Sequence, residues 1–457
     1  MLIAAAALAS ALNAEASSVV QSGKAVGVQY AVVQSGTIAA TGAAGLADID
    51  TKAAVTGDTR FRIGSITKLF TAVAVMQLVE RQQLSLDDTL ARFAPSFPSA
   101  ASITVRDLLL HRSGIANYFD AALANGSAQK PTTPPEILLS MAVKPLLSAP
   151  GSAFEYSNTN YVLLGQIVER TSGLPLHEYY RTKIFEPAGM TQTFAGTPPS
   201  GVPLATGYVS SPDGTDAPAD PGDISWYYAC GDAWSTASDL ARFDVALMNG
   251  VLIRSTTLQA MIAAAQPSTL GHRIDYGLGI MRSPSGGDDS LVGHHGGLPG
   301  FAGDDEMIVP ERFAVISLGN TSSYPTSSML GVTFEVLYPD RVKALRSESL
   351  AEAKARAAEE DVALTQRFTK FFSSLLSGKL DKTGLSSAMA AAMTPETVQQ
   401  ISQYFAKDGT FLKLQYLDRD TLDGYQRYHY GAVFSGASQP VMFVLDAKGD
   451  LSGFFLR

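Results

Sequence analysis

Apolar residues run almost without interruption from Leu69 to Val79, broken only by Thr71 and Gln77. A segment of this length that is apolar on all sides predicts a helix buried in a core. Just upstream, polar and apolar residues alternate from residue 59 to 63, as in a strand. Gly64 lies between the two patterns and lets the backbone turn. We therefore expect a short strand, a turn and a buried helix that begins at Ser65.

Strand patterns lie near both ends of the first 345 residues and predict one sheet built from both ends. They cover residues 26–33, 37–40, 290–293, 306–309 and 313–318. From about residue 85 to 245, helical patterns alternate with Pro- and Gly-rich loops. Ser85 and Thr104 each precede an acidic residue by three positions, which is typical of the capped start of a short helix. This middle section is predicted to be largely helical.

The last part of the chain has a different pattern. A charged, Ala-rich stretch at 348–370 predicts a helix, and strand patterns follow at 411–416, 425–430 and 441–445. Helices followed by antiparallel strands predict a small α+β domain. We expect this domain to span residues 346–457 and a larger domain to span residues 12–345.

The first eleven residues have two interpretations. They are apolar and end in Ala9-Ser10-Ala11, as in a secretory signal remnant, although no basic residue precedes them. This interpretation predicts a periplasmic or secreted protein. The alternative is an Ala-rich first helix that continues to Gln21, which leaves a cytoplasmic location open.

Composition narrows the class of protein. The chain has 457 residues, is 46% hydrophobic and carries a formal net charge of −9 with scattered basic residues. This charge disfavours a nucleic-acid or anionic-membrane partner. Cys230 is the single cysteine, and none of the six histidines has a metal-ligand spacing, so we expect no metal and no cofactor. We expect no integral membrane segment, and the oligomeric state stays open.

Ser65 and Lys68 stand three positions apart at the start of the buried helix, so the amine can reach the hydroxyl. This is the geometry of an activated nucleophile. The alternative is a structural role, in which the serine only caps a core helix. The same spacing recurs at Ser127 and Lys130, in a loop beside Gly126, where we interpret it as accidental.

Two further segments are candidates for the same chemistry. Tyr156-Ser157-Asn158 is the only Tyr-x-Asn among seventeen tyrosines; its phenol could relay a proton and its amide could hold Lys68. Its alternative is a core tyrosine with a capping asparagine. In 293–301, glycines after His294 and His295 allow close approach of the backbone to a ligand. Its alternative is a hairpin with surface histidines, and 429–431 and 382–384 compete for the same role.

These residues together resemble the serine β-lactamase and penicillin-binding protein superfamily. The similarity is greatest to its branch of class C β-lactamases, D-alanyl-D-alanine carboxypeptidases, D-aminopeptidases and esterases. It extends over residues 12 to 335 and includes, in order, segments 61–68, 109–115, 187–190 and 234–243. It implies an α/β fold of the β-lactamase type: an antiparallel sheet flanked by helices, with a largely helical subdomain.

The resemblance also implies a role for each motif residue. Ser65 would be the nucleophile, Lys68 its base partner, Tyr156 a second proton-transfer group, and Asn158 would orient Lys68 and the substrate. His294 would replace the lysine of the third motif. His295, Gly296 and Gly297 would bind substrate, and the N–H groups of Ser65 and Gly297 would form an oxyanion hole.

The third motif departs from the Lys-Thr-Gly of the superfamily. An unperturbed histidine is largely neutral at pH 7, whereas lysine carries a fixed charge that holds a substrate carboxylate. β-Lactamase activity is therefore not expected as the main role. We expect a serine hydrolase that forms an acyl-enzyme on Ser65 and cleaves a small amide, a peptide with or without a D-residue, or an ester. The alternative is a non-catalytic sensor or binding protein with the same fold.

Overall fold

The chain forms two compact units, Met1–Tyr338 and Pro339–Arg457, in a computed structural model. The structure describes residues 2–119, 122, 126–210, 215–270, 274–283, 290–343, 360–406, 408–422, 425–435 and 438–456. The expected domain boundary between residues 345 and 346 lies outside the described residues, a few positions after the observed division.

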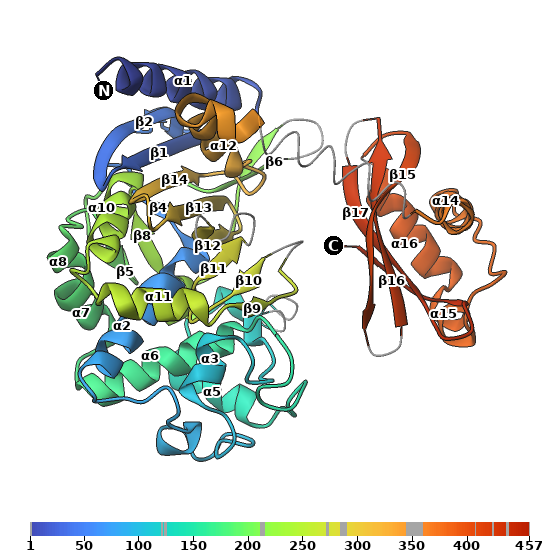
Figure 1. The fold of residues 1–457 in the computed structure, drawn as a ribbon, viewed down its shortest axis with the longest axis horizontal. Coiled ribbons are helices and arrows are strands. Elements are labelled where there is room, and N and C mark those ends of the chain that lie inside the picture. The colour runs from blue at the N-terminus through green and yellow to red at the C-terminus, as the bar shows by residue number, and fades with distance from the viewer. Residues whose placement is uncertain are drawn as a thin grey trace. The chain divides into compact units, whose positions relative to one another are not determined.

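A nine-stranded antiparallel sheet is the centre of the first unit (Figure 1). Its order is β3-β2-β1-β14-β13-β12-β11-β10-β9. The strands are β1 (Gly27–Gln34), β2 (Thr37–Asp48), β3 (Ala53–Ala54), β9 (Gln266–Pro267), β10 (Asp275–Tyr276), β11 (Met281–Ser283), β12 (Leu291–Leu298), β13 (Phe301–Ile308) and β14 (Phe313–Gly319). Because β1 pairs with β14, the sheet joins both ends of the unit, which confirms the prediction.

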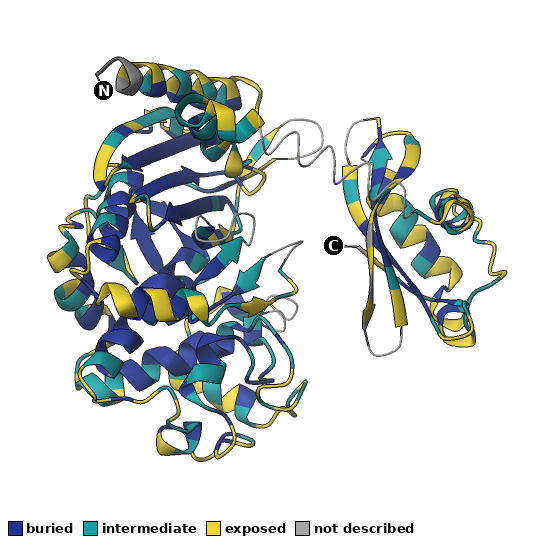
Figure 2. Ribbon diagram, in the orientation of Figure 1, coloured by how far each residue is buried: buried dark blue, intermediate teal, exposed yellow. Residues whose placement is uncertain are grey.

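Each face of this sheet packs against helices. Helices α1 (Leu2–Gln21) and α12 (Ser327–Leu337) share a core with one face, in which Leu8 and Leu12 are fully buried. Residues 2–21 therefore form the continuous helix of the second interpretation. The opposite face packs against α2 (Thr67–Glu80) and α10 (Ala237–Met248), and Figure 2 shows the central strands of the sheet as largely buried.

The middle of the first unit is largely helical, as expected. Among the described residues, the first unit also contains helices α3 (Val105–Leu109), α5 (Pro134–Ala142), α6 (Asn158–Ser172), α7 (Leu176–Tyr180), α8 (Glu186–Ala188), α9 (Tyr228–Gly231) and α11 (Ser255–Ala263). Its short strands are β4 (Phe61–Arg62), β5 (Phe194–Ala195), β6 (Tyr208–Ser210), β7 (Asp216–Pro218) and β8 (Ala233–Ser235). Thr104 and Asp107 form the expected capping box at α3. The prediction of a helix at Ser85 is wrong. This segment is a turn in which the Ser85 N–H donates a hydrogen bond to the Asp88 carboxylate.

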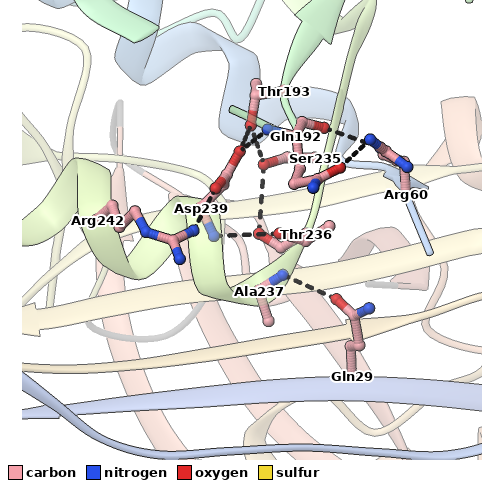
Figure 3. A network of polar contacts seen from close by, with 9 residues as sticks. All are labelled: Gln29, Arg60, Gln192, Thr193, Ser235, Thr236, Ala237, Asp239 and Arg242. Atoms are coloured by element: carbon pink, nitrogen blue, oxygen red, sulfur yellow. Dashed lines mark hydrogen bonds and ion pairs between the residues drawn. The ribbon is translucent and has the colours of Figure 1, made fainter. Parts of the chain in front are cut away.

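A polar network connects the end of β8 and the start of α10 to the sheet (Figure 3), and it includes Ser235 of β8, whose Oγ lies 2.8 Å from Thr193 Oγ1. The N–H of Ala237, at the start of α10, donates to Gln29 Oε1 of β1 at 2.9 Å. The Asp239 carboxylate accepts from Gln192 N–H at 2.6 Å and from Thr193 Oγ1 at 2.8 Å. Since β8 pairs with β4, the network also positions the strand that leads into Ser65.

The second unit is a small α+β domain with its own core. It contains α14 (Val362–Leu376), α15 (Ser387–Ala392), α16 (Pro395–Ala406) and an antiparallel sheet of β15 (Phe411–Leu422), β16 (Tyr425–Phe434), β17 (Ser438–Leu445) and β18 (Leu451–Leu456). The helix predicted at 348–370 lies partly outside the described residues, and its described part belongs to α14. No helix in the described part of the chain combines the length and apolarity needed to cross a bilayer.

Two fully buried carboxyl groups in the first unit, those of Asp244 in α10 and Asp305 in β13, make stability depend on pH. Burial and their mutual repulsion raise the pKa of Asp244, and burial raises that of Asp305 from 3.8 to about 7. Because the folded state then binds more protons than the unfolded state, stability falls as pH rises from about 4 to about 7.

Asp305→Asn is expected to flatten this dependence and to stabilise the first unit at pH 8 by on the order of 2 kcal/mol. The measurement is urea unfolding at pH 5 and pH 8 followed by tryptophan fluorescence, since both tryptophans lie in the first unit. The exposed Asp58→Asn is the control. An unchanged pH dependence in Asp305→Asn would contradict the assignment.

Candidate active site

Ser65 lies in a 3₁₀ turn, Gly64–Ile66, directly before α2, so the helix begins two residues later than predicted. Strand β12 packs closely against this turn, backbone to backbone. A Cβ atom on Gly64, whose φ is +52°, would lie 3.0 Å from the Gly297 nitrogen, and one on Gly296 would lie 2.0 Å from the Ile63 oxygen. Glycine at both positions therefore allows the backbone of Ser65 and that of Gly297 to approach each other. A Cβ on Gly297 would meet only open space, so the backbone is accessible there.

Lys68 is fully buried in the first turn of α2, and its three hydrogen bonds account for all the protons of an ammonium group. Its Nζ donates to Ser65 Oγ at 2.9 Å, to Asn158 Oδ1 at 2.8 Å and to the Cys230 carbonyl at 2.9 Å. The amine thus has one fixed position, in contact with the candidate nucleophile. The Cys230 carbonyl has no counterpart in the motif pattern and was not predicted.

Tyr156 and Asn158 reach Ser65 and Lys68 from the start of α6. Tyr156 Oη donates to Ser65 Oγ at 3.0 Å, and Lys68 Nζ lies 5.0 Å from the centre of the Tyr156 ring. Ser65 Oγ therefore accepts two hydrogen bonds, an arrangement that favours negative charge on this oxygen. The structure brings together the four residues that the first two motifs single out.

His111, which lies in the matching segment 109–115 but received no role from the sequence, supports the second motif. Its ring is fully buried with its centre 4.3 Å from that of Tyr156, and its Nδ1 accepts the Ser157 N–H at 3.1 Å. Burial and the charge of Lys68 hold the pKa of His111 well below its usual value. A neutral imidazole therefore backs the catalytic candidate Tyr156.

His294 makes its hydrogen bonds with groups other than these four residues. It is fully buried, its Nε2 lies 3.0 Å from Tyr276 Oη and its Nδ1 lies 2.6 Å from the His295 carbonyl oxygen. Among the contacts of the described residues, its ring has no hydrogen bond to Ser65, Lys68 or Tyr156. Burial and the charge of Lys68 hold its pKa well below the usual value, so it is neutral at pH 7. Its predicted catalytic role stays a prediction.

His295, expected to bind substrate, has carboxyl groups as its neighbours. Its Nδ1 lies 2.7 Å from Asp304 Oδ1 and its Nε2 lies 3.6 Å from Glu306 Oε1. The hydrogen bond to Asp304 raises the pKa of His295 to about 9, so the ring is cationic at pH 7. Each ring nitrogen faces a carboxyl group. The positive charge of His295 is therefore balanced by an acidic side chain of the protein itself.

The competing motifs lie elsewhere. Ser127 begins a single 3₁₀ turn, Ser127–Gln129, and Lys130 follows it in extended conformation, so the pair does not lie on an α-helix. Lys382-Thr383-Gly384 lies in a turn between α14 and α15, and residues 429–431 lie in β16. Both are in the second unit, with its own separate core.

Comparison with known proteins decides the family. Residues 12–330 match the family model described as Beta-lactamase. The chain belongs to this family. The matched region contains all three motifs and ends within the first unit.

The similar proteins include penicillin-binding proteins, D-aminopeptidases and a D-amino acid amidase. A putative penicillin-binding protein PbpX of Bacillus subtilis is 32% identical over 53% of this chain and 57% of its own length. A D-aminopeptidase of Brucella anthropi is 30% identical over 68% and 59%. The solved D-amino acid amidase from Ochrobactrum anthropi SV3, complexed with L-phenylalanine amide, is 29% identical with a TM-score of 0.64, covering 73% of this chain and 99% of that one. The chain spans about three fifths of the length of these curated relatives.

Proposed function

We propose that this protein is a serine hydrolase that transfers the acyl group of a small amide or peptide to Ser65 and then to water. The observation that carries the proposal is the position of Ser65 Oγ between Lys68 Nζ and Tyr156 Oη, at 2.9 and 3.0 Å. A partly exposed hydroxyl between two proton-transfer groups, one of them a buried amine, has the arrangement of an activated nucleophile.

The proposed reaction has two halves. The Lys68–Tyr156 pair must first give up one proton to solvent, because an ammonium group and a phenol cannot accept another. As Ser65 Oγ then attacks the substrate carbonyl, its proton passes to this pair, and the carbonyl oxygen becomes an oxyanion held by the N–H groups of Ser65 and Gly297. The bond to the leaving nitrogen breaks as that nitrogen takes up the proton. Water then attacks the ester on Ser65, gives a proton to the same pair, and releases the acid as Ser65 regains its proton.

The charges at the third motif bear on the substrate class. His294 is neutral, and the cation at His295 is matched by Asp304. Neither supplies the free positive charge that would hold a carboxylate next to the cleaved bond. This supports amides and peptides with an uncharged leaving group, in line with the D-aminopeptidase and amidase names of the relatives. A D-configured acyl residue is part of this proposal.

A matched substrate pair tests this proposal. D-alanyl-D-alanine amide is expected to be hydrolysed with a kcat/KM at least about tenfold above that of the free acid, a difference near 1.4 kcal/mol. The L,L-amide should be slower than the D,D-amide, and nitrocefin should be a poor substrate. Preference for the free acid would contradict the assigned leaving group. No turnover of any amide, peptide or ester would favour the alternative of a binding or sensor protein.

A further inference from the structure

The hydrogen bonds of His294 fix where its proton lies. The His295 carbonyl oxygen can only accept, so the Nδ1 atom 2.6 Å away must carry the hydrogen. In a neutral ring Nε2 is then an acceptor, and the group that donates to it is the Tyr276 hydroxyl at 3.0 Å. Burial raises the pKa of Tyr276, so this hydroxyl keeps its proton.

We propose that Tyr276 is a positioning residue that holds His294 as the neutral Nδ1–H tautomer, so that the His294 ring braces the edge of β12 on which Gly297 lies. This inference rests on the proposed function only in the consequence it has for turnover. The tautomer itself is a property of the folded protein.

The brace acts on the part of β12 that lacks a strand neighbour on one side. Strand β11 pairs only with Leu291–Gly293. Within the described part of the chain, β12 beyond Gly293 pairs with β13 alone, and no backbone ladder is seen at its other edge. Alternate residues of a strand direct their N–H and C=O groups to the same edge. The His295 carbonyl and the Gly297 N–H therefore share an edge, and the bond from His294 Nδ1 fixes the strand two residues before Gly297.

Several groups around His294 oppose its protonation. Lys68 of α2 and His295 of β12 each lower the pKa of His294, and its charge would in turn face His111. Tyr156, whose ring centre lies 6.5 Å from that of His294, and Tyr276 of β10 complete the surroundings. Asp305 of β13 is the cross-strand partner of His294, and burial raises the pKa of its carboxyl group to about 7, so below that pH this group is mostly protonated and neutral. A positively charged His294 would then be uncompensated, and the neutral form is the one that the site stabilises.

Tyr276 itself sits in an aromatic cluster that keeps it in place. Its ring contacts those of His111 and Phe154, with centres 4.8 and 5.7 Å away, and its hydroxyl lies 3.3 Å from that of Tyr161. Removal of the hydroxyl alone would leave this packing intact. Tyr276→Phe therefore separates the hydrogen bond to His294 from the shape of the cluster.

The test combines NMR with kinetics. In ¹⁵N-histidine-labelled wild-type protein, the His294 signal, identified by its loss in His294→Gln, is expected to show a protonated Nδ1 and an unprotonated Nε2 from pH 8 to pH 5.5. In Tyr276→Phe this single-tautomer signature should be lost, and kcat should fall by about 10- to 100-fold with little change in KM. Tyr208→Phe, which removes another buried tyrosine hydroxyl that accepts the Ile49 N–H, is the matched control and should retain wild-type values.

The outcomes separate the two proposals. A wild-type His294 that carries its proton on Nε2, or that is charged at pH 7, overturns the brace whatever the enzyme hydrolyses. An unchanged signature in Tyr276→Phe also overturns it, as does an equal loss of kcat in Tyr208→Phe. If no substrate is turned over, the proposed function is contradicted. The NMR result still decides the tautomer, because it does not depend on turnover.

Discussion

Ser65→Ala is expected to lower kcat/KM for every substrate by roughly 10⁴-fold or more, because the acyl-enzyme cannot form without its oxygen. The fold should not change. Ser65 is partly exposed and its side chain serves no cap, so the variant loses only the bonds from Lys68 and Tyr156. The measurement is steady-state hydrolysis of the D-alanyl-D-alanine amide, with the tryptophan-fluorescence midpoint in urea as the check on folding.

The second Ser-x-x-Lys provides the control for this variant. Ser127→Ala changes the same residue type at the same spacing from a lysine, in a loop that offers no helix. It is expected to retain wild-type hydrolysis. Equal loss in both variants would show that the effect does not come from the nucleophile.

Lys68→Met is expected to lower kcat by about 10²- to 10⁴-fold, the range typical of a lost general base. Methionine has nearly the length of lysine but no donor, so Ser65, Asn158 and the Cys230 carbonyl each lose a hydrogen bond. Loss of activity with a retained unfolding midpoint would place the effect in catalysis.

Stability needs a separate check because all three of those partners are partly or fully buried. The exposed Lys130→Met is the matched control, and it should keep both activity and stability. A Lys68→Met enzyme that is folded and hydrolyses at the wild-type rate would remove Lys68 from the mechanism. Penicillin binding measured on the same preparation would then show whether Ser65 reacts without the amine.

The sequence was most informative where chemistry is carried by side chains at fixed spacing. Ser65 and Lys68 lie on adjacent turns, and Tyr156 and Asn158 flank one helix start, so a motif describes each pair. The family resemblance then supplied the link between the pairs, which are about ninety positions apart in sequence. Their meeting at Ser65 Oγ is a tertiary contact that no local pattern contains.

The supporting residues could not be found in this way. Tyr276 is one of seventeen tyrosines and lies in a two-residue strand, and nothing in its neighbours marks it as the partner of His294. The Cys230 carbonyl is a backbone group and has no sequence signal. His111 lies in a segment that matches the family, and this match was the one available sign that it matters.

Local patterns misplaced some element boundaries for a related reason. The helix expected from Ser65 begins at Thr67, because Gly64–Ile66 tighten into a 3₁₀ turn against β12. Strand β18 (Leu451–Leu456) was not predicted. It is stabilised by its pairing with β17, and such a pairing is not visible in the local sequence pattern. In both places tertiary packing determines the backbone, whereas the predictions used periodicity alone.

Covalent labelling tests the central claim most directly. The folded wild-type chain is incubated with a fluorophosphonate probe and, in parallel, with a penicillin, and the adduct is located by peptide mass spectrometry. We predict one adduct, on Ser65, absent from Ser65→Ala and present in Ser127→Ala. A folded protein that stays unlabelled at Ser65, or that carries the adduct on another serine, would contradict the account.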